Sequence, residues 1–371
     1  MTPPELLSLR DLTRRDAFRN GIEWLQQSAR LMRAVTPDGF LCDWGELDNK
    51  IEAFRLFQYA DRELHVSADR AARNAGDTFR SIWVLEGAGH MAGMASSLSV
   101  HGLLTAGAAA KLPDCAMVPL HAGMGTAFAE KLFAGLPSNP SAAEIGATVR
   151  HFVNACRANC RPGWEDACVE PFGLVVRCLY PGLLSRVSTA AEEVSPALRH
   201  LFWHGVGRGL YFVPTNFLPI SGARERMLKN AAEEADDTDD RRNVLAGLIW
   251  AVTLVNLKRP AVIGSVAAIC SRLKLQDVFI NGLISALMAW RHMAPADERE
   301  IAPYLRLQPG MQPRSRAEQA LWKAWIETPA RDALHDISPG LQLRNNIPAL
   351  YTYRTHEELC RLSAAANGVQ I

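Results

Sequence analysis

Apolar residues recur at helical spacing along most of this chain. Between positions 79 and 98 they lie at Phe79, Ile82, Trp83, Leu85, Met91, Met94 and Leu98, so that several pairs are three or four residues apart. Such spacing places them along one side of a helix. No stretch alternates apolar and polar residues over the length of a strand, and no Asn-Gly or Asp-Gly pair lies between β-branched runs. The pattern predicts an all-α protein in which strands are scarce.

Proline and glycine divide this helical pattern into segments. Breaks are predicted at 112–114, 137–140, 161–163, 180–182, 214–219 and 259–260. Proline and glycine are the residues that most often end helices or form the turns between them. The segments between the breaks predict helices of about one to two dozen residues each.

A second pattern overlies the first: a polar residue, a glycine, a bulky residue and a second small residue precede an apolar run. The copies are Glu86-Gly87-Ala88-Gly89, His121-Ala122-Gly123-Met124-Gly125, Glu170-Pro171-Phe172-Gly173 and His204-Gly205-Val206-Gly207, with fainter copies at Ala246-Gly247 and Asn281-Gly282. Their spacing of roughly 34 to 48 residues is typical of stacked helical hairpins. It predicts repeated helical hairpins that form an α/α toroid or a compact solenoid.

The repeat also suggests how the chain is organised. Residues 1–77 lack it and are expected to form an N-terminal helical cap, because a repeat array needs a polar terminal unit. Residues 78–295 would be the repeated core. Residues 296–371 combine proline and glycine breaks with a helix bearing Leu321, Trp322 and Trp325, and are expected to form a helical and irregular C-terminal wrap on that core.

Composition excludes several classes of function. The 371 residues carry a net charge of +1 at pH 7, so no bulk attraction to nucleic acid or to an anionic membrane is expected. Aromatic residues do not alternate with basic clusters, which argues against nucleic-acid binding. The longest apolar stretch, 244–257, is too short to span a membrane, and the N-terminal residues lack the apolar core of a signal peptide. We therefore expect a cytoplasmic protein.

Candidate chemistry lies beside the repeated glycines. Glycine inside a helix costs about 1 kcal/mol relative to alanine, so its repetition needs a reason, either close helix packing or close approach of a ligand. The repeat places Glu86, His121, Glu170 and His204 at equivalent points, where they would converge as acid–base groups. The alternative for each is structural: a core histidine bonded to a carbonyl, or a glutamate that caps a helix or pairs with arginine.

Substrate-binding candidates lie near the same motifs. Arg208 is expected either to clamp a carboxylate or phosphate or to pair with Glu86 or Glu170. His90 would join the interior cluster. Trp203 and Tyr211, which flank the fourth copy, complete the predicted substrate-binding set. No motif for a dinucleotide, a P-loop, a nucleophile elbow or a zinc helix is present.

An acidic segment raises the question of a metal. Asp236-Asp237-Thr238-Asp239-Asp240 fits the Asp-Asp-x-x-Asp pattern of class I terpene synthases, which bind diphosphate through magnesium. Asp236, Asp237 and Asp240 are therefore candidate ligands for Mg²⁺ or another divalent ion. The second metal motif of that family is absent downstream. An exposed acidic loop is the favoured interpretation, and no cofactor is assigned.

Three segments resemble one known family. They are 85–91, 121–127 and 202–212, with the acidic residue before the first glycine, the histidine two residues before Gly123, and Gly207-Arg208 followed by aromatic residues. They are similar to a domain-of-unknown-function family found in bacterial enediyne and related natural-product gene clusters, over about residues 78 to 290. The chain departs from it at Pro171, which replaces a glycine, and at Trp203, where relatives tend to be acidic. The resemblance implies a setting in bacterial specialised metabolism.

These observations lead to one functional prediction and two alternatives. The prediction is an enzyme acting on a small, mostly apolar or amphipathic, polyketide- or isoprenoid-like substrate in a central cavity, by acid–base cyclisation, isomerisation or elimination. Glu86 and Glu170 would be the acid–base pair, His121 and His204 their partners, and Arg208 an anion clamp. The alternatives are a non-catalytic helical scaffold of a biosynthetic pathway and a magnesium-dependent diphosphate lyase. No oligomeric state is indicated.

Overall fold

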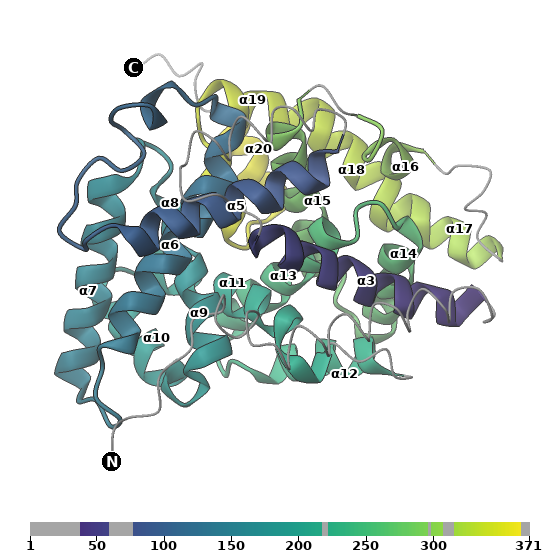
Figure 1. Cartoon of the computed structure of the whole chain (residues 1–371). Coiled ribbons are helices and arrows are strands. Elements are labelled where there is room, and N and C mark those ends of the chain that lie inside the picture. The colour runs from purple at the N-terminus through teal and green to yellow at the C-terminus, as the bar shows by residue number, and fades with distance from the viewer. Residues whose placement is uncertain (1–37, 59–76, 217–221, 296–297, 307–314, 365–371) are drawn as a thin grey trace, which may run out of the picture.

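The computed structural model describes residues 38–58, 77–216, 222–295, 298–306 and 315–364, and side chains from residue 45 onward. Within these ranges the chain is all-helical and has no strand, as the sequence pattern predicts (Figure 1). The helices are α3 (Asp38–Gln58), α5 (Thr78–Ala95), α6 (Met117–Ala134), α7 (Ala142–Asn159), α8 (Glu165–Val169), α9 (Pro171–Leu179), α10 (Leu184–Val194), α11 (Pro196–Phe212), α12 (Ala223–Glu233), α13 (Thr238–Val255), α14 (Pro260–Leu273), α15 (Gln276–Met293), α16 (Ala302–Leu305), α17 (Arg316–Trp322), α18 (Thr328–Asp332), α19 (Ser338–Leu343) and α20 (His356–Ala364).

Local sequence explains where several helices begin. Ser141 and Glu144 form a reciprocal capping box at the start of α7, in which each side chain accepts a hydrogen bond from the other residue's backbone amide. Ser195 caps α11, and Pro196 follows it at the first helical position. Pro260 opens α14 in the same way. The predicted breaks at 137–140 and 161–163 fall between helices, and the break at 259–260 coincides with the start of α14.

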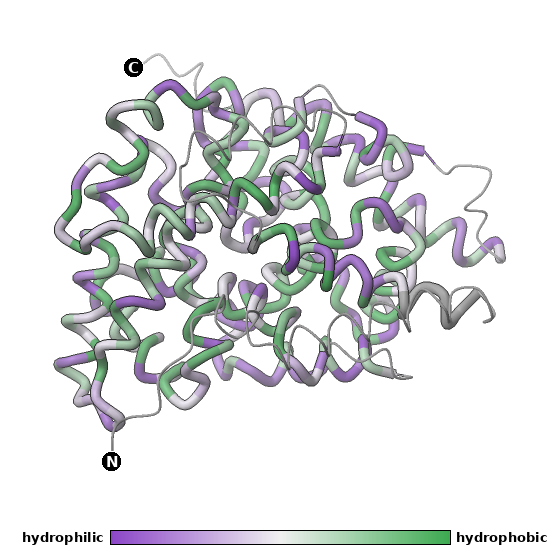
Figure 2. The backbone as a smooth tube through the Cα atoms, viewed as in Figure 1, coloured by the Kyte–Doolittle hydropathy of each residue, from purple (hydrophilic) through white to green (hydrophobic). Residues whose placement is uncertain are grey.

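The core is formed by central helices that are hydrophobic around most of their circumference. Residues 244–255 of α13 are all buried, so the apolar stretch noted in the sequence is the interior of a core helix. Figure 2 shows long hydrophobic stretches in the central helices and a largely hydrophilic α12. Among the described residues no single helix is long and apolar enough to cross a membrane, and the one helix pair that meets the test jointly, 165–179 with 181–194, bends by 114°.

The repeated glycines bring helix backbones into direct contact. In the pair α5–α6, Gly123 lies against the carbonyl of Glu86, and Gly89 lies against the carbonyl of Leu120. A Cβ atom at either glycine would overlap that oxygen. The same reciprocal contact joins α9 to α11 through Gly173 and Gly205, and α11 to α13 through Gly207 and Gly247. Glycine is therefore required here because no larger residue lets the axes approach so closely.

This contact follows one rule. In each pair of helices, each helix contributes one backbone carbonyl and a glycine three residues after it. The glycine of each helix packs against the carbonyl of the other helix. The carbonyl residues of the first helix are Glu86, Glu170 and His204. In the pair α13–α15 the carbonyl of Ala246 meets Gly282, but Ile249 stands where a glycine would complete the contact. Glu86, Glu170 and His204 thus occupy structurally equivalent positions.

Replacing Gly205 by alanine should lower the free energy of unfolding by about 1–3 kcal/mol or more, because the new methyl group would overlap the Glu170 carbonyl and two helices would have to separate. Urea denaturation measures the change. Gly182→Ala is the matched control, because a Cβ there meets nothing within 4 Å; it should shift stability by no more than about 0.5 kcal/mol. Equal effects of the two substitutions would contradict the packing role.

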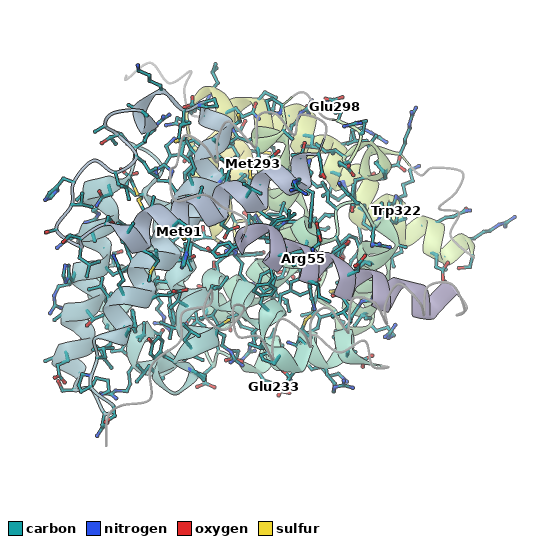
Figure 3. All side chains as sticks on the ribbon, viewed as in Figure 1. Arg55, Met91, Glu233, Met293, Glu298 and Trp322 are labelled. Atoms are coloured by element: carbon teal, nitrogen blue, oxygen red, sulfur yellow. The ribbon has the colours of Figure 1, made fainter. Side chains whose placement is uncertain are left out.

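Outer helices cover this central set. Helix α3 packs against α5 and also contacts α13 and α14, and Figure 1 shows one end of α3 beside α5 at the front of the molecule. Figure 3 labels Arg55 on α3 and Met91 on α5. Helices α17, α18 and α19 are joined by π-helical turns and pack on the core with α15 and α20. The predicted cap, 1–77, lies mainly outside the described residues.

The acidic segment matches its prediction in part. We expected an exposed acidic loop, and residues 234–237 are non-helical and 236–239 exposed, but α13 already begins at Thr238. Asp237 caps α13 by accepting hydrogen bonds from the amides of Asp239 and Asp240. The sequence pattern was ambiguous because aspartate is common both in exposed loops and as the capping residue at the start of a helix.

Candidate functional site

Four ionisable side chains meet in the interior, and we call them the buried cluster: Glu86, Glu170, His204 and Arg208. The Arg208 guanidinium donates to Glu170 Oε2 over 2.5 Å and to Glu86 Oε1 over 3.4 Å. Nδ1 of His204 lies 2.7 Å from Glu170 Oε1. All four residues are buried. The expected convergence is therefore present for Glu86, Glu170 and His204, with Arg208 between the two carboxyl groups.

The glycine contacts explain why these side chains converge. Glu86, Glu170 and His204 occupy the equivalent carbonyl position of three successive helix pairs, so their side chains leave the backbone beside the same kind of close contact. Arg208 lies three residues after Gly205 and one turn after His204 on α11. Because the helices pack closely, these side chains come within hydrogen-bonding distance of one another.

The pKa values of the two carboxyl groups are shifted in opposite directions. Burial raises the pKa of Glu86, and the attraction of Arg208, opposed by the Glu170 charge, does not bring it back to its ordinary value. Burial also acts to raise the pKa of Glu170, but the Arg208 charge and the hydrogen bond with His204 outweigh it and hold that pKa below its ordinary range. Glu170 is therefore the fixed anion of the cluster, and Glu86 is the group that holds a proton more readily.

Aromatic residues that the sequence did not indicate surround Arg208. The guanidinium carbon lies 4.9 Å from the centre of the Trp250 ring, which is cation–π distance. The Tyr351 ring lies 5.7 Å from that of Trp250 and 6.4 Å from that of His204. The Tyr351 hydroxyl is buried, has no hydrogen-bond partner among the described residues, and its pKa is raised by burial. Tyr351 comes from the C-terminal segment, far along the chain, so no local motif points to it.

One side of Glu86 faces an apolar cavity of about 60 Å³, which we call the aromatic cavity. Its lining comes from α3, α5, α6, α9 and α11 and consists of Ala53, Phe54, Phe57, Trp83, Glu86, Thr126, Leu174, Cys178 and Phe212. Thr126 donates its hydroxyl hydrogen to the Ala122 carbonyl, and Cys178 directs its thiol to the Gly209 carbonyl. Within this lining Glu86 supplies the carboxyl group, and the Trp83 ring carries a further polar N–H. Glu170 does not line it.

His121 lies apart from the buried cluster. Its Nδ1 is 2.8 Å from the carbonyl oxygen of Met117, and its Nε2 accepts from the backbone amide of Arg161. Burial lowers the pKa of His121 to about 4, so the ring is neutral at physiological pH. The expectation that His121 shares the equivalent position of Glu86, Glu170 and His204 is therefore wrong. Both ring nitrogens are occupied by backbone groups, which is the structural alternative.

The three remaining substrate-binding candidates make separate contacts. His90 Nε2 lies 3.2 Å from Glu130 Oε2, and its ring packs 5.1 Å from Phe57, which lines the aromatic cavity. The Trp203 indole donates to the hydroxyl of Ser188 on α10. The Tyr211 hydroxyl donates to Glu46 of α3 and accepts from the Asn256 side chain. Of these three, His90 lies next to the site, whereas the polar groups of Trp203 and Tyr211 serve helix packing.

The carboxylates of two of the three metal candidates make structural contacts. Asp240 is buried and forms a two-pronged ion pair with Arg199, with Arg199 Nε 2.9 and 3.0 Å from its two oxygens. Asp237 caps α13, and the Asp236 carbonyl accepts from Arg241. No group of three or more His, Cys, Asp or Glu residues within the described ranges is placed to hold a metal ion.

Comparison with known proteins adds no assignment. The chain matches no family model, no curated protein and no solved structure. The family resemblance of the glycine motifs therefore stays a prediction, and the geometry of the buried cluster and the aromatic cavity has to support any functional proposal.

Proposed function

We propose that this protein is an enzyme in which Glu86 transfers protons to and from an apolar substrate held in the aromatic cavity. The observation that carries the proposal is the position of Glu86, a buried carboxyl with a raised pKa at the surface of an otherwise apolar cavity. A carboxyl whose pKa is raised toward the working pH serves well as general acid and then as general base. The reaction class would be isomerisation, cyclisation or elimination.

The other cluster members would position Glu86 and would not touch the substrate. Glu170 neutralises the guanidinium of Arg208, and His204 fixes the second oxygen of Glu170. Arg208 then holds Glu86 Oε1 through one longer hydrogen bond. This arrangement supports a proton on Glu86, because the positive charge of Arg208 is largely committed to Glu170. We assign Glu170 a positioning role in place of its predicted role as the second catalytic acid.

The wider setting belongs to the same proposal. We infer a polyketide- or isoprenoid-like substrate, in bacterial specialised metabolism in the cytoplasm, from the resemblance of the glycine motifs. We also propose that α5, α6, α9, α11, α13 and α15 form one stack of hairpins, as in an α/α toroid or a compact solenoid. The support for this arrangement is the glycine contact that recurs between successive helices.

The test uses solvent deuterium. Purified protein in D₂O is incubated with an organic extract of a strain that lacks its gene, and mass spectrometry identifies compounds that are consumed and products that gain one deuterium. Protonation of a carbon atom by Glu86 predicts such products with the wild type and with Glu192→Gln, a control at an exposed carboxyl. Glu86→Gln should give none. Equal deuterium incorporation by Glu86→Gln would refute the assignment.

A non-catalytic scaffold is the second candidate, and two observations favour it. The glycines meet backbone carbonyls, so much of the interior is closed, and Glu86 is ion-paired with Arg208. The two candidates differ in what Glu86 contributes. In a scaffold the Glu86–Arg208 pair would stabilise the fold, whereas in the enzyme its neutralisation would mainly stop turnover.

A further inference from the structure

We infer that the aromatic cavity stabilises positive charge, so that its substrate is an alkene that Glu86 converts to a carbocation. This inference rests on the proposed function and narrows its substrate class. The first observation is the composition of the wall: the rings of Phe54, Phe57, Trp83 and Phe212 line a space to which Glu86 contributes a carboxyl group. Aromatic faces attract cations, most strongly where water is excluded.

The rings come from three helices, α3, α5 and α11. Trp83 and Glu86 are one helical turn apart on α5 and are both buried, so they form the inner wall. Phe54, Phe57 and Phe212 are half-buried, and the Phe54 and Phe212 rings meet edge to face at 5.5 Å. A ligand on the carboxyl therefore has ring surfaces around it and no cationic side chain in the described lining.

The charge balance points the same way. The Arg208 guanidinium is 2.5 Å from Glu170 but 3.4 Å from Glu86, so Glu170 provides its closer counter-charge. Once Glu86 gives up its proton, its carboxylate is left with partial compensation from Arg208. A positive charge in the cavity would complete the compensation. Proton transfer creates that pair of charges in one step.

The size fits a small branched group. A cavity of about 60 Å³, on the measure by which one water needs ~10–15 Å³, accepts a group of roughly five heavy atoms. A trimethylammonium group and the branched five-carbon end of an isoprenoid chain are both of this size. A neutral polyketide carbonyl, by contrast, would need a hydrogen-bond donor, and those of Thr126 and Cys178 in the described lining already point to backbone carbonyls.

The chemical step balances without a further reactant. The Glu86 proton adds to one carbon of a C=C bond, so that a C–H bond forms, the π bond breaks, and a tertiary cation and a carboxylate result. Loss of a proton from a neighbouring carbon to the carboxylate forms a new C=C bond and restores Glu86. The net change is isomerisation, or cyclisation if a second double bond attacks the cation first.

A matched pair of probes tests the inference. Choline and 3,3-dimethylbutan-1-ol have the same shape, but choline has a cationic nitrogen where the alcohol has a neutral carbon. Isothermal titration of the full-length protein should show choline binding about tenfold more tightly than the alcohol. Phe57→Leu and Glu86→Gln should weaken choline binding severalfold, Glu86→Gln should leave alcohol binding nearly unchanged, and the exposed-site control Glu192→Gln should bind both probes as the wild type does.

The outcomes separate the inference from the proposed function. Equal binding of the two probes to the wild type would overturn the cation inference and leave the aromatic cavity as a site for a neutral apolar substrate. Failure of both probes to bind would overturn the cavity as a ligand site, and with it the proposed function. Tighter choline binding that neither Phe57→Leu nor Glu86→Gln weakens would place the cation elsewhere and would also overturn the inference.

Discussion

Glu170→Gln should lower the free energy of unfolding by about 3–5 kcal/mol at neutral pH. Glu170 is fully buried and is the closest counter-charge of the Arg208 guanidinium, at 2.5 Å. The substitution keeps the shape of the side chain but removes its charge, and a buried guanidinium without its main counter-charge is strongly unfavourable. It also replaces the anionic partner of His204 Nδ1. Urea denaturation, followed by far-UV circular dichroism, measures the loss.

Two further variants serve as controls for this result. Glu192→Gln removes a carboxyl whose side chain is 43% exposed, and should change stability by no more than about 0.5 kcal/mol. The double variant Glu170→Leu with Arg208→Met replaces both charges by apolar groups, and should recover most of the lost stability, since replacing a whole buried ion pair is often nearly neutral. A stability change below about 1 kcal/mol for Glu170→Gln alone would show that the cluster does not depend on this charge.

The pH dependence gives an independent check on Glu170. Its pKa in the folded protein lies below its ordinary value, so the folded state binds the proton less readily than the unfolded state. The stability contributed by ionised Glu170 is therefore present above the unfolded pKa and is lost as pH falls through the folded pKa. Wild-type stability should decline over that acidic range, and Glu170→Gln, which cannot titrate there, should lack this part of the decline.

Much of the fold could be predicted from the sequence because helices depend on local signals. The apolar spacing predicts the helices, and proline breaks such as Pro260 coincide with helix starts. The repeated glycines left open close helix packing or close approach of a ligand, and the structure shows packing; both members of each reciprocal pair, such as Gly89 and Gly123, were visible as motifs. The exposure of the acidic segment was predicted but the helix start at Asp237 was not, because composition alone does not distinguish an exposed loop from the capped start of a helix.

The candidate site was predicted in part, and the reason lies in helical geometry. Treating the residue before each motif as equivalent grouped His121 with His204, although His121 is two residues before Gly123 and His204 is one residue before Gly205. Each residue adds 100° around a helix, so these two side chains point in different directions. Trp203, which is two residues before Gly205, does correspond to His121, and both contact outer elements of the fold.

The cavity wall could not be predicted, because it is assembled from distant segments. Trp83 is one turn before Glu86, and Phe212 is one turn after Arg208, so both lie on faces that the helix pattern could have indicated. Phe54 and Phe57 come from α3, which carries no copy of the repeat. Tyr351 reaches the cluster from the C-terminal segment. Such contacts depend on tertiary packing, for which a single sequence has no local signal.

Glu86→Gln should abolish the proposed activity while leaving the free energy of unfolding at pH 7 unchanged or increased. Removal of a general acid or base lowers the rate by about 10²–10⁴-fold, and Glu86 would serve in both roles. The stability is expected to hold because burial raises the pKa of Glu86, which means that the fold favours its neutral form. Glutamine is neutral, keeps the shape, and offers an oxygen to Arg208, which retains Glu170. The deuterium assay and urea denaturation measure the two effects on the same preparation.

The pH dependence of this variant separates enzyme from scaffold. Because the folded pKa of Glu86 lies above its unfolded value, the stability contributed by its neutral form is fully present below the unfolded pKa and is lost as pH rises through the folded pKa. Glu86→Gln keeps its neutral form throughout, so its stability relative to wild type should rise with pH over that range. In a scaffold held by the Glu86–Arg208 ion pair, the variant would instead lose stability at neutral pH. The two carboxyl groups of the buried cluster should therefore have opposite effects on the free energy of unfolding. Glu170 stabilises the fold as an anion, whereas Glu86 destabilises it when charged, as expected of a group retained for proton transfer.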